Sequence, residues 1–123
     1  MTRIVLVDDH ALVRDGLRSI LAEHPDLCVV GEASDGEMAI EVARQLRPDV
    51  ILMDVNMPRM NGLEATRLIT TEFPEITVVG LSMQDDEQTD LSMQKAGAIG
   101  LVSKGDVAGK LVQVIEAVRS AKN

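Results

Sequence analysis

The sequence is poor in aromatic residues: its 123 residues include one Phe and neither Trp nor Tyr. Its core must therefore be aliphatic, built from Val, Ile, Leu, Ala and seven Met. Base-stacking platforms for nucleic acids need exposed rings, and so do sugar-binding faces. The composition therefore disfavours both kinds of binding site.

Positive charge is scarce as well. There are 12 Lys and Arg against 20 Asp and Glu, which gives a formal net charge of −8. A phosphate backbone would repel such a domain, which argues against direct binding of nucleic acid by these residues. A hard cation or a basic partner surface is favoured instead.

Cysteine and long apolar runs are nearly absent. Cys28 is the only cysteine, so no internal disulfide can form, and its apolar neighbours indicate a small core residue. No apolar run approaches the length of about 20 residues that a membrane-spanning helix needs. The first residues carry no signal-peptide pattern. We therefore expect a cytoplasmic protein that makes no contact with a membrane.

Short apolar, β-branched runs alternate with stretches of helical spacing along the chain. The runs predict strands over 3–7, 27–33, 49–53, 76–81 and 98–102. The spacing predicts helices over 10–23, 62–72, 84–95 and 106–120, and one more that begins at 34–36 and ends at 46. Ser34 or Asp35 is expected to cap the second helix, and Asn61 the third. Five strands alternating with five helices predict an α/β protein of one domain, with an open parallel sheet covered on both faces. The periodicity leaves the strand order open.

Polar side chains follow the ends of four expected strands. Asp8 and Asp9 follow the first strand, Asp54 the third, Ser82 the fourth and Lys104 the fifth. Because ligands of open parallel sheets bind beyond the carboxyl ends of the strands, we expect these side chains at one edge. Helix capping could explain the acid pair, and a turn could explain Ser82. Asp54 has no such explanation, because its strand is buried and a charge there costs stability.

Three carboxylates in one crevice require a compensating cation. Two carboxylates about 4 Å apart repel by roughly 4 kcal/mol at an effective dielectric constant of about 20. An oxygen-only ligand set selects Mg²⁺ or Mn²⁺, and we interpret the neighbouring His10 as a residue of the helix start. A carboxylate beside such a cation can attack phosphorus and form an acyl phosphate. Lys104 and the Ser82 hydroxyl would then bind the phosphoryl oxygens.

This ordered set resembles the receiver domains of response regulators in two-component signalling. The resemblance covers essentially the whole chain, and the segments "DDHALVRDGLRSIL" and "DVNMPRMNGLEATR" are most similar to the NarL/FixJ-type (LuxR-type) transcriptional regulators. The resemblance implies a flavodoxin-like (CheY-like), doubly wound sheet of strand order 2-1-3-4-5 with five helices.

The resemblance also implies a role for each candidate site residue. Asp54 would receive a phosphoryl group from a sensor histidine kinase, and Ser82 and Lys104 would bind that group. The Mg²⁺ or Mn²⁺ ligands would be Asp8 (mainly through water), Asp9, Asp54 and the main-chain carbonyl of Asn56. The domain would be a switch rather than an enzyme, with self-phosphorylation and self-dephosphorylation as its only activities.

The output implied by the resemblance is transcription regulation through a DNA-binding effector domain, with a homodimer forming on phosphorylation. Residues 1–123 would be the receiver. Residues 119–123 would begin a linker to a C-terminal helix-turn-helix domain that lies outside this sequence. The alternative is a stand-alone receiver that acts through protein contacts.

Three positions depart from the family pattern. Leu101 stands where receivers often have an aromatic residue that reorients on activation. Gly105 stands where a proline often follows the lysine. Met83 is bulkier than the residue often found beside the hydroxyl, and we expect it to restrict access to the phosphoryl group.

Three other classes fit the sequence less well. A haloacid-dehalogenase-like phosphatase also uses an Asp nucleophile, but it needs a second Asp two residues further on, where this chain has Asn56. A flavodoxin-like electron carrier needs a phosphate loop after the first strand and rings around the flavin, and the chain has neither. An interaction module without phosphorylation is disfavoured by the complete acid set.

Overall fold

The computed structural model describes residues 1–57, 60–83 and 87–122. Its strands are β1 (Thr2–Val7), β2 (Leu27–Ala33), β3 (Val50–Asp54), β4 (Thr77–Ser82) and β5 (Gly100–Ser103). Its α-helices are α1 (Ala11–Ala22), α2 (Gly36–Leu46), α3 (Gly62–Glu72), α4 (Glu87–Lys95) and α5 (Val112–Lys122). A 3₁₀ turn, η1 (Lys104–Asp106), and a π-helical turn, η2 (Val107–Leu111), connect β5 to α5.

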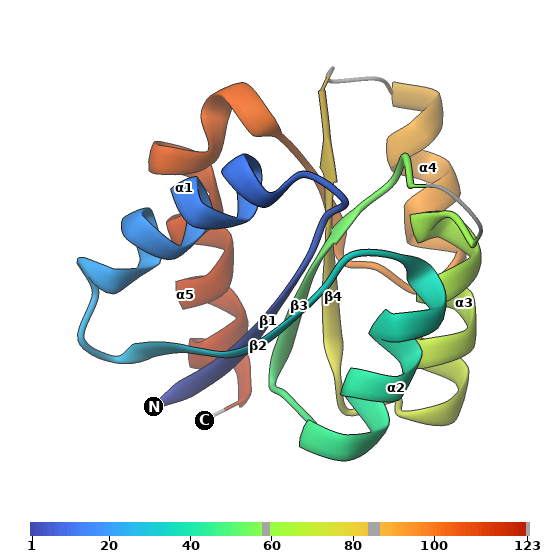
Figure 1. Cartoon of the computed structure of the whole chain (residues 1–123), viewed down its shortest axis with the longest axis horizontal. Helices are drawn as coiled ribbons and strands as arrows, with labels where there is room; N and C mark the ends of the chain where they lie inside the picture. The colour runs from blue at the N-terminus through green and yellow to red at the C-terminus, as the bar shows by residue number, and fades with distance from the viewer. Residues whose placement is uncertain (58–59, 84–86, 123) are drawn as a thin grey trace.

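The five strands form one parallel sheet in the order β2-β1-β3-β4-β5. Helices α1 and α5 cover one face of the sheet, and α2, α3 and α4 cover the other (Figure 1). The predicted fold class, a flavodoxin-like doubly wound sheet of order 2-1-3-4-5, is therefore confirmed.

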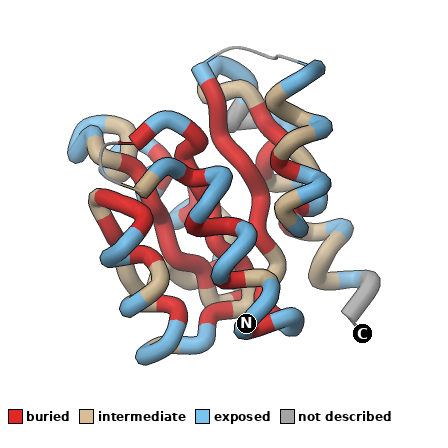
Figure 2. The backbone as a smooth tube through the Cα atoms, turned by 90° about the vertical axis from the view of Figure 1, so that its right-hand side faces the viewer, coloured by how far each residue is buried: buried red, intermediate tan, exposed pale blue. Residues whose placement is uncertain are grey.

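The pleat of the central strands divides the core in two. Ile4 and Leu6 pack on the side of α1 and α5, whereas Val5 and Val7 pack on the side of α2, α3 and α4. Successive side chains of a strand point to opposite faces, so a continuous apolar run buries both. Figure 2 shows this burial along the strands, with the exposed positions on the outer sides of the helices. As the composition predicted, both halves are aliphatic apart from the buried ring of Phe73.

Two predicted helix caps are present. Asp35 Oδ1 accepts a hydrogen bond from the backbone N–H of Met38 at 2.8 Å. Asn61 Oδ1 accepts a hydrogen bond from the backbone N–H of Glu64 at 2.9 Å. Helix α1 instead begins after His10, whose side chain makes no capping hydrogen bond. The acid pair therefore does not serve as the cap of α1, which removes the ordinary explanation for it.

The element boundaries differ from the prediction where the chain approaches the carboxyl edge of the sheet. Three strands extend one residue further than predicted, so that Asp54, Ser82 and Ser103 are the last residues of β3, β4 and β5. The reason is pairing: Asp54 is in register with Leu81, and Ser82 with Ser103. The last helix is not continuous from residue 106, because η2 precedes α5. The predicted start of the fourth helix, at residues 84–86, lies outside the described residues.

Two smaller expectations concern Cys28 and membranes. Cys28 lies on the edge strand β2 and is half-buried, so it is less enclosed than a core residue. Among the described residues no helix is both long enough and apolar enough to span a bilayer.

Candidate functional site

The carboxyl edge of the sheet brings together the acidic and basic residues that follow its strands. Asp8 and Asp54 are buried, with 0% and 2% of their surface exposed. Lys104 Nζ lies 2.7 Å from Asp8 Oδ2 and 3.3 Å from Asp54 Oδ1. Asp8 and Lys104 are 96 positions apart in the sequence. They form one buried ion-pair network with Asp54 because their strands end at the same edge of the sheet.

The Asp54 carboxylate has one satisfied oxygen and one open oxygen. Its Oδ1 accepts from the backbone N–H of Asn56 at 3.2 Å and also faces Lys104. Its Oδ2 is buried and accepts no hydrogen bond from the described part of the chain. Burial raises the pKa of Asp54 above its usual value, and the charge of Asp8 adds to this, while the Asn56 N–H and Lys104 oppose it. A buried open oxygen of this kind suits a cation or a phosphoryl group.

Lys104 is the counter-charge of the buried acids. Burial of its ammonium group works to lower the pKa, but the hydrogen bond and charge of Asp8, together with the charge of Asp54, outweigh burial and raise the pKa. The side chain therefore stays protonated at neutral pH. Its 3₁₀ turn, η1, directs it back over the sheet edge toward both acids.

The start of helix α3 lies against the main chain of Asp54 and fixes its position. The Gly62 N–H donates to the carbonyl of Val55 at 3.2 Å. A Cβ on Gly62 would overlap the main-chain carbonyl of Asp54, so only glycine lets the helix start so close to the strand end. Asn61, one residue earlier, caps the helix. The motif "NG" thus positions the phosphoacceptor candidate as well as beginning the helix.

Arg14 is a site residue that the sequence did not reveal. Its Nη1 donates to the main-chain carbonyl of Asp8 at 2.5 Å, and its Nε donates to Glu32 Oε1 at 2.9 Å. Arg18 also pairs with Glu32. These contacts tie α1 to the ends of β1 and β2 and hold the acid pair in place. Helical spacing shows only that Arg14 belongs to a helix, so no sequence signal indicated this role.

The residues present fit a divalent cation. One ligand atom each from Asp8, Asp9, His10 and Asp54 lies within 4.8 Å of the others. The buried oxygens Asp9 Oδ1 and Asp54 Oδ2 accept no hydrogen bond from described residues. Carboxylate oxygens are the ligands that Mg²⁺ prefers. The three carboxylates of this group are therefore suited to Mg²⁺ or Mn²⁺.

A small cavity of about 290 Å³ opens onto this cluster. Its lining includes Asp54, Asn56 and Lys104, and Met83 stands at its mouth with 72% of its surface exposed. Ser82 is buried at the end of β4, one position beyond the register partner of Asp54. All the predicted site residues therefore lie along one edge, and the roles given to each of them remain predictions.

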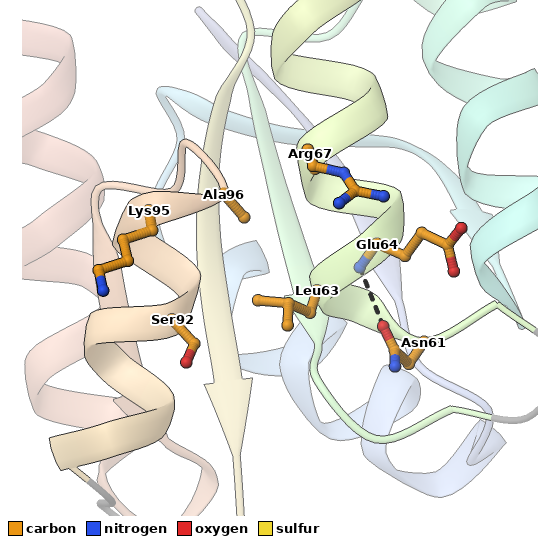
Figure 3. A pocket seen from close by; sticks show the side chains of 7 residues that line it. All are labelled: Asn61, Leu63, Glu64, Arg67, Ser92, Lys95 and Ala96. Atoms are coloured by element: carbon orange, nitrogen blue, oxygen red, sulfur yellow. Dashed lines mark hydrogen bonds between the residues drawn. The ribbon is translucent and has the colours of Figure 1, made fainter.

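A groove between α3 and α4 lies beside the site. Its volume is about 520 Å³, and Figure 3 shows its lining residues, with Leu63 of α3 pointing toward α4. The hollow of about 340 Å³ next to it shares Asn61, Leu63 and Ser92 with the groove and reaches Asn56. Its charged lining residues are Glu64, Arg67 and Lys95.

Leu101 and Gly105 can now be placed. Leu101 is buried in β5, and a Cβ on Gly80 of β4 would meet its Cδ1 at 2.8 Å and the Cε of Met93 at 3.0 Å. Leu101 therefore packs against Gly80 of β4, beside Met93 of α4. None of the peptide bonds in the described ranges is cis, which agrees with glycine rather than proline after Lys104.

The fold and this acid cluster define a class of signalling domain. The chain belongs to the response regulator receiver domain family, whose model matches residues 4–116. Members of this family are signalling switches of two-component systems that partner sensor kinases and bind Mg²⁺ at the acidic pocket.

Named relatives support the same assignment. The chain is 43% identical to the transcriptional regulatory protein DegU of Brevibacillus brevis over 94% of its own length and 49% of that protein. It is 43% identical to the response regulator GacA of Pseudomonas viridiflava over 96% of its length and 55% of GacA. The chain therefore spans about half the length of these relatives.

A solved structure places the chain among the LuxR-type receivers. It resembles a two-component response regulator of the LuxR family from Aurantimonas sp. SI85-9A1, with a TM-score of 0.93 and 36% identity over 98% of this chain and 86% of that one. The predicted kinship with NarL/FixJ (LuxR-type) regulators is confirmed.

Proposed function

We propose that the domain is a phosphoacceptor switch in which Asp54 receives a phosphoryl group from the phosphohistidine of a sensor histidine kinase. The observation that carries the proposal is the buried Asp54 carboxylate, whose Oδ2 has no hydrogen-bond partner among the described residues and whose Oδ1 faces Lys104. A structural acid would have both oxygens satisfied. Its open oxygen supports a role as a reactant.

In the transfer step, a carboxylate oxygen of Asp54 forms a bond to phosphorus while the P–N bond of the donor breaks. The electron pair of that bond returns to the imidazole nitrogen of the kinase, which then takes up a proton. Lys104 and Ser82 bind phosphoryl oxygens and hold the group in line with Asp54. In self-dephosphorylation, water attacks the phosphorus of the aspartyl phosphate, the P–O bond to Asp54 breaks, and the group leaves as inorganic phosphate while the carboxylate is restored.

Asp8, Asp9, Asp54 and the main-chain carbonyl of Asn56 are the residues that would hold Mg²⁺, with Mn²⁺ as a substitute. The cation supplies neutralisation of the negative charge that accumulates between the carboxylates and the phosphoryl group. The Asp8 carboxylate is held for this by the His10 N–H at 2.9 Å and by Lys104.

Phosphorylation would then change the conformation of the domain. Moving a two-state switch from 1:99 to 99:1 takes about 5.5 kcal/mol. Hydrogen bonds from Ser82 and Lys104 to a charged group contribute roughly 1.5–3 kcal/mol each, which covers much of this requirement. Leu101 would transmit the change by repacking against α4 rather than by rotation of a ring.

The output follows from the relatives. We propose transcription regulation in the cytoplasm, with a homodimer on phosphorylation and DNA bound only through an effector domain outside this sequence. Residues 119–123 would lead into its linker; residues 119–122 continue α5, and residue 123 lies outside the described residues. The alternative, a stand-alone receiver that acts through protein contacts, is separated from this by light scattering with and without a beryllofluoride phosphoryl mimic.

The first prediction tests the phosphoacceptor directly. Acetyl phosphate or phosphoramidate with Mg²⁺ is expected to add one phosphoryl group to the wild-type chain, and Asp54→Asn is expected to abolish the addition because the nucleophilic oxygen is gone. Intact mass spectrometry measures the product. Asp15→Asn, an exposed acid on α1, is the matched control and is expected to label normally. Undiminished labelling of Asp54→Asn would refute the assignment.

A further inference from the structure

His10 presents a nitrogen donor to the acid cluster. Its backbone N–H donates to Asp8 Oδ1 at 2.9 Å, which fixes the residue at the start of α1. Its ring nitrogen Nδ1 lies 3.3 Å from Asp8 Oδ1 and 3.1 Å from Asp9 Oδ1. The ring also lines the cavity that holds Asp54 and Asn56. The imidazole therefore faces the same space as the carboxylates that would hold Mg²⁺.

The spacing of these atoms is that of ligands around one ion. Zinc–nitrogen and zinc–oxygen bonds are about 2.0–2.2 Å, so two ligands at about 90–110° around the metal are roughly 3.0–3.4 Å apart. The two Nδ1–oxygen distances, 3.1 and 3.3 Å, fall in this interval. The widest spread in the group is 4.8 Å, which exceeds the roughly 4.2 Å of opposite ligands. For all four residues to bind one ion, the two most distant atoms would have to approach each other by about 0.6 Å.

Two buried oxygens show that the cluster is incomplete without a ligand. Asp54 Oδ2, on a side chain that is only 3% exposed, accepts no hydrogen bond from described residues. The same holds for Asp9 Oδ1, although Nδ1 of His10 is close to it. Lys104 approaches Asp8 through Oδ2, whereas His10 approaches through Oδ1. The ammonium and the imidazole therefore contact different oxygens of Asp8, and both side chains line the cavity of about 290 Å³ beside Asp54.

We propose that His10 is an additional metal ligand, which makes the acid cluster a site for divalent transition-metal ions such as Zn²⁺, Co²⁺ or Ni²⁺. The inference rests on the proposed Mg²⁺ site, because the same carboxylates supply the oxygen ligands. Imidazole suits these metals, whereas Mg²⁺ prefers oxygen alone. A site with three carboxylates and one imidazole therefore binds them more tightly than Mg²⁺. A transition ion held there excludes Mg²⁺ from the cluster.

The exposure of His10 is compatible with this role. Its side chain is 67% exposed, so an ion can reach Nδ1 from solvent without opening the core. The competing explanation is that the ring serves only as a partner for the acid charges. The two explanations differ in one respect: a ligand discriminates between metals, whereas a charge partner does not.

The test compares metals and histidine variants by calorimetry and NMR. We expect Zn²⁺ and Co²⁺ to bind the wild-type chain with Kd values at least tenfold below that of Mg²⁺. His10→Ala and His10→Gln are expected to weaken Zn²⁺ and Co²⁺ by roughly tenfold or more and Mg²⁺ by less than about twofold. His24→Ala, which removes the other histidine of the chain, is the matched control and keeps the wild-type affinities. Circular dichroism verifies that each variant is folded.

The NMR arm reports the bond itself. With two histidines in the chain, the ¹⁵N spectrum of labelled imidazoles contains only two rings. Zn²⁺ is expected to shift Nδ1 of His10 and to leave His24 unchanged. If His10 does not shift, or if its variants lose no affinity for Zn²⁺, the inference is wrong while Mg²⁺ binding and the proposed function stand. If no metal binds the wild-type chain, both the inference and the proposed metal site are wrong.

Discussion

At the scale of single residues, Asp54 is in an environment that opposes its charge. It is buried, and Asp8 lies in the same network, while Lys104 must be shared between the two acids. The network therefore has two carboxylates for one ammonium group. A cation bound there would neutralise the excess negative charge, and a phosphoryl group would change the charge distribution.

The second prediction concerns pH. The pKa of Asp54 is raised above its ordinary value of 3.8, so the native state binds this proton more tightly than the unfolded state. Protonation of Asp54 therefore stabilises the native state. This stabilisation is complete below the pKa that Asp54 has in the unfolded state, and it is lost as the pH rises through the pKa of the native state. In EDTA at pH 7, Asp54→Asn is therefore expected to raise the free energy of unfolding by about 1–3 kcal/mol. Urea denaturation measures it.

The pH series supplies the check on this prediction. The gain from Asp54→Asn is expected to shrink as the pH falls and the wild-type carboxyl becomes protonated. Asp15→Asn, in an exposed position, is expected to give a difference near zero at every pH. A less stable Asp54→Asn at pH 7 would show that the charge of Asp54 stabilises the fold, contrary to the raised pKa.

Sequence reasoning identified the candidate site residues but not the contacts that position them. Carboxylates after parallel strands are visible in a sequence because they interrupt apolar runs, and Asp54 was found in this way, whereas the Asn56 carbonyl came from the family resemblance. The contacts of Arg14 with Asp8 and of His10 with the acid pair were not found, because helix periodicity gives no distance across a loop. We interpreted His10 as a residue of the helix start, and its position before α1 agrees, but the ring also faces the site.

At the scale of elements, the contact of Gly62 with the Asp54 carbonyl couples α3 to β3. The helix cannot begin at this distance with any side chain at that position. A shift of α3 therefore moves the main chain of Asp54, the proposed phosphoacceptor, and a change at Asp54 acts on the helix in turn. The N-terminal end of α3, which carries this contact, also borders the groove shown in Figure 3.

The third prediction uses two glycines as a matched pair. Gly62→Ala is expected to lower the free energy of unfolding by about 1–3 kcal/mol, because its Cβ would overlap backbone that cannot yield freely. Gly16→Ala, in the middle of α1 with nothing within 4 Å of its Cβ, is expected to raise it by about 0.5–1 kcal/mol. Urea denaturation measures both, and phosphoryl labelling is expected to slow in Gly62→Ala alone. Equal effects of the two substitutions would contradict the proposed contact.

The connection from β5 to α5 shows a limit of sequence patterns at this scale. Apolar spacing predicted one helix from residue 106, and the structure has a 3₁₀ turn, a π-helical turn and then α5. The apolar positions Leu111 and Ile115 are four residues apart and buried, as in an ordinary helix, so the pattern does not distinguish the turn types. Lys104 lies in the 3₁₀ turn η1, so the type of turn determines which groups its ammonium can contact.

At the scale of the whole molecule, the fold was predictable in class and not in detail. Alternating apolar runs and helical stripes predicted five strands and five helices with two covered faces, because burial on both sides of a sheet leaves a clear pattern. Strand order depends on contacts between distant segments, which no local pattern contains. The order 2-1-3-4-5 came from the family resemblance and was confirmed by the sheet.

The fourth prediction concerns metal binding by the whole domain. A ligand that binds only the folded state at about 100 times its Kd stabilises by about 2.7 kcal/mol, which corresponds to a rise in Tm of roughly 10 °C for a domain of this size. We expect this rise with Mg²⁺ and its reversal by EDTA, measured by calorimetry. NaCl at matched ionic strength is the control, since a domain of net charge −8 also gains from screening. An equal rise in NaCl would contradict a specific site.

The strand order has a consequence for the newly made chain. Asp8 follows β1 and Asp54 ends β3, whereas Lys104 follows β5, the last of the five strands along the chain. A ribosome adds about 5–20 residues per second, so for some seconds the nascent sheet has its acids without their ammonium partner. During that interval dissolved cations are the counter-charges available to the two acids. Docking of β5 then completes the sheet edge and delivers the ammonium group in one event, so the fold and the charge balance of the acid cluster are completed together.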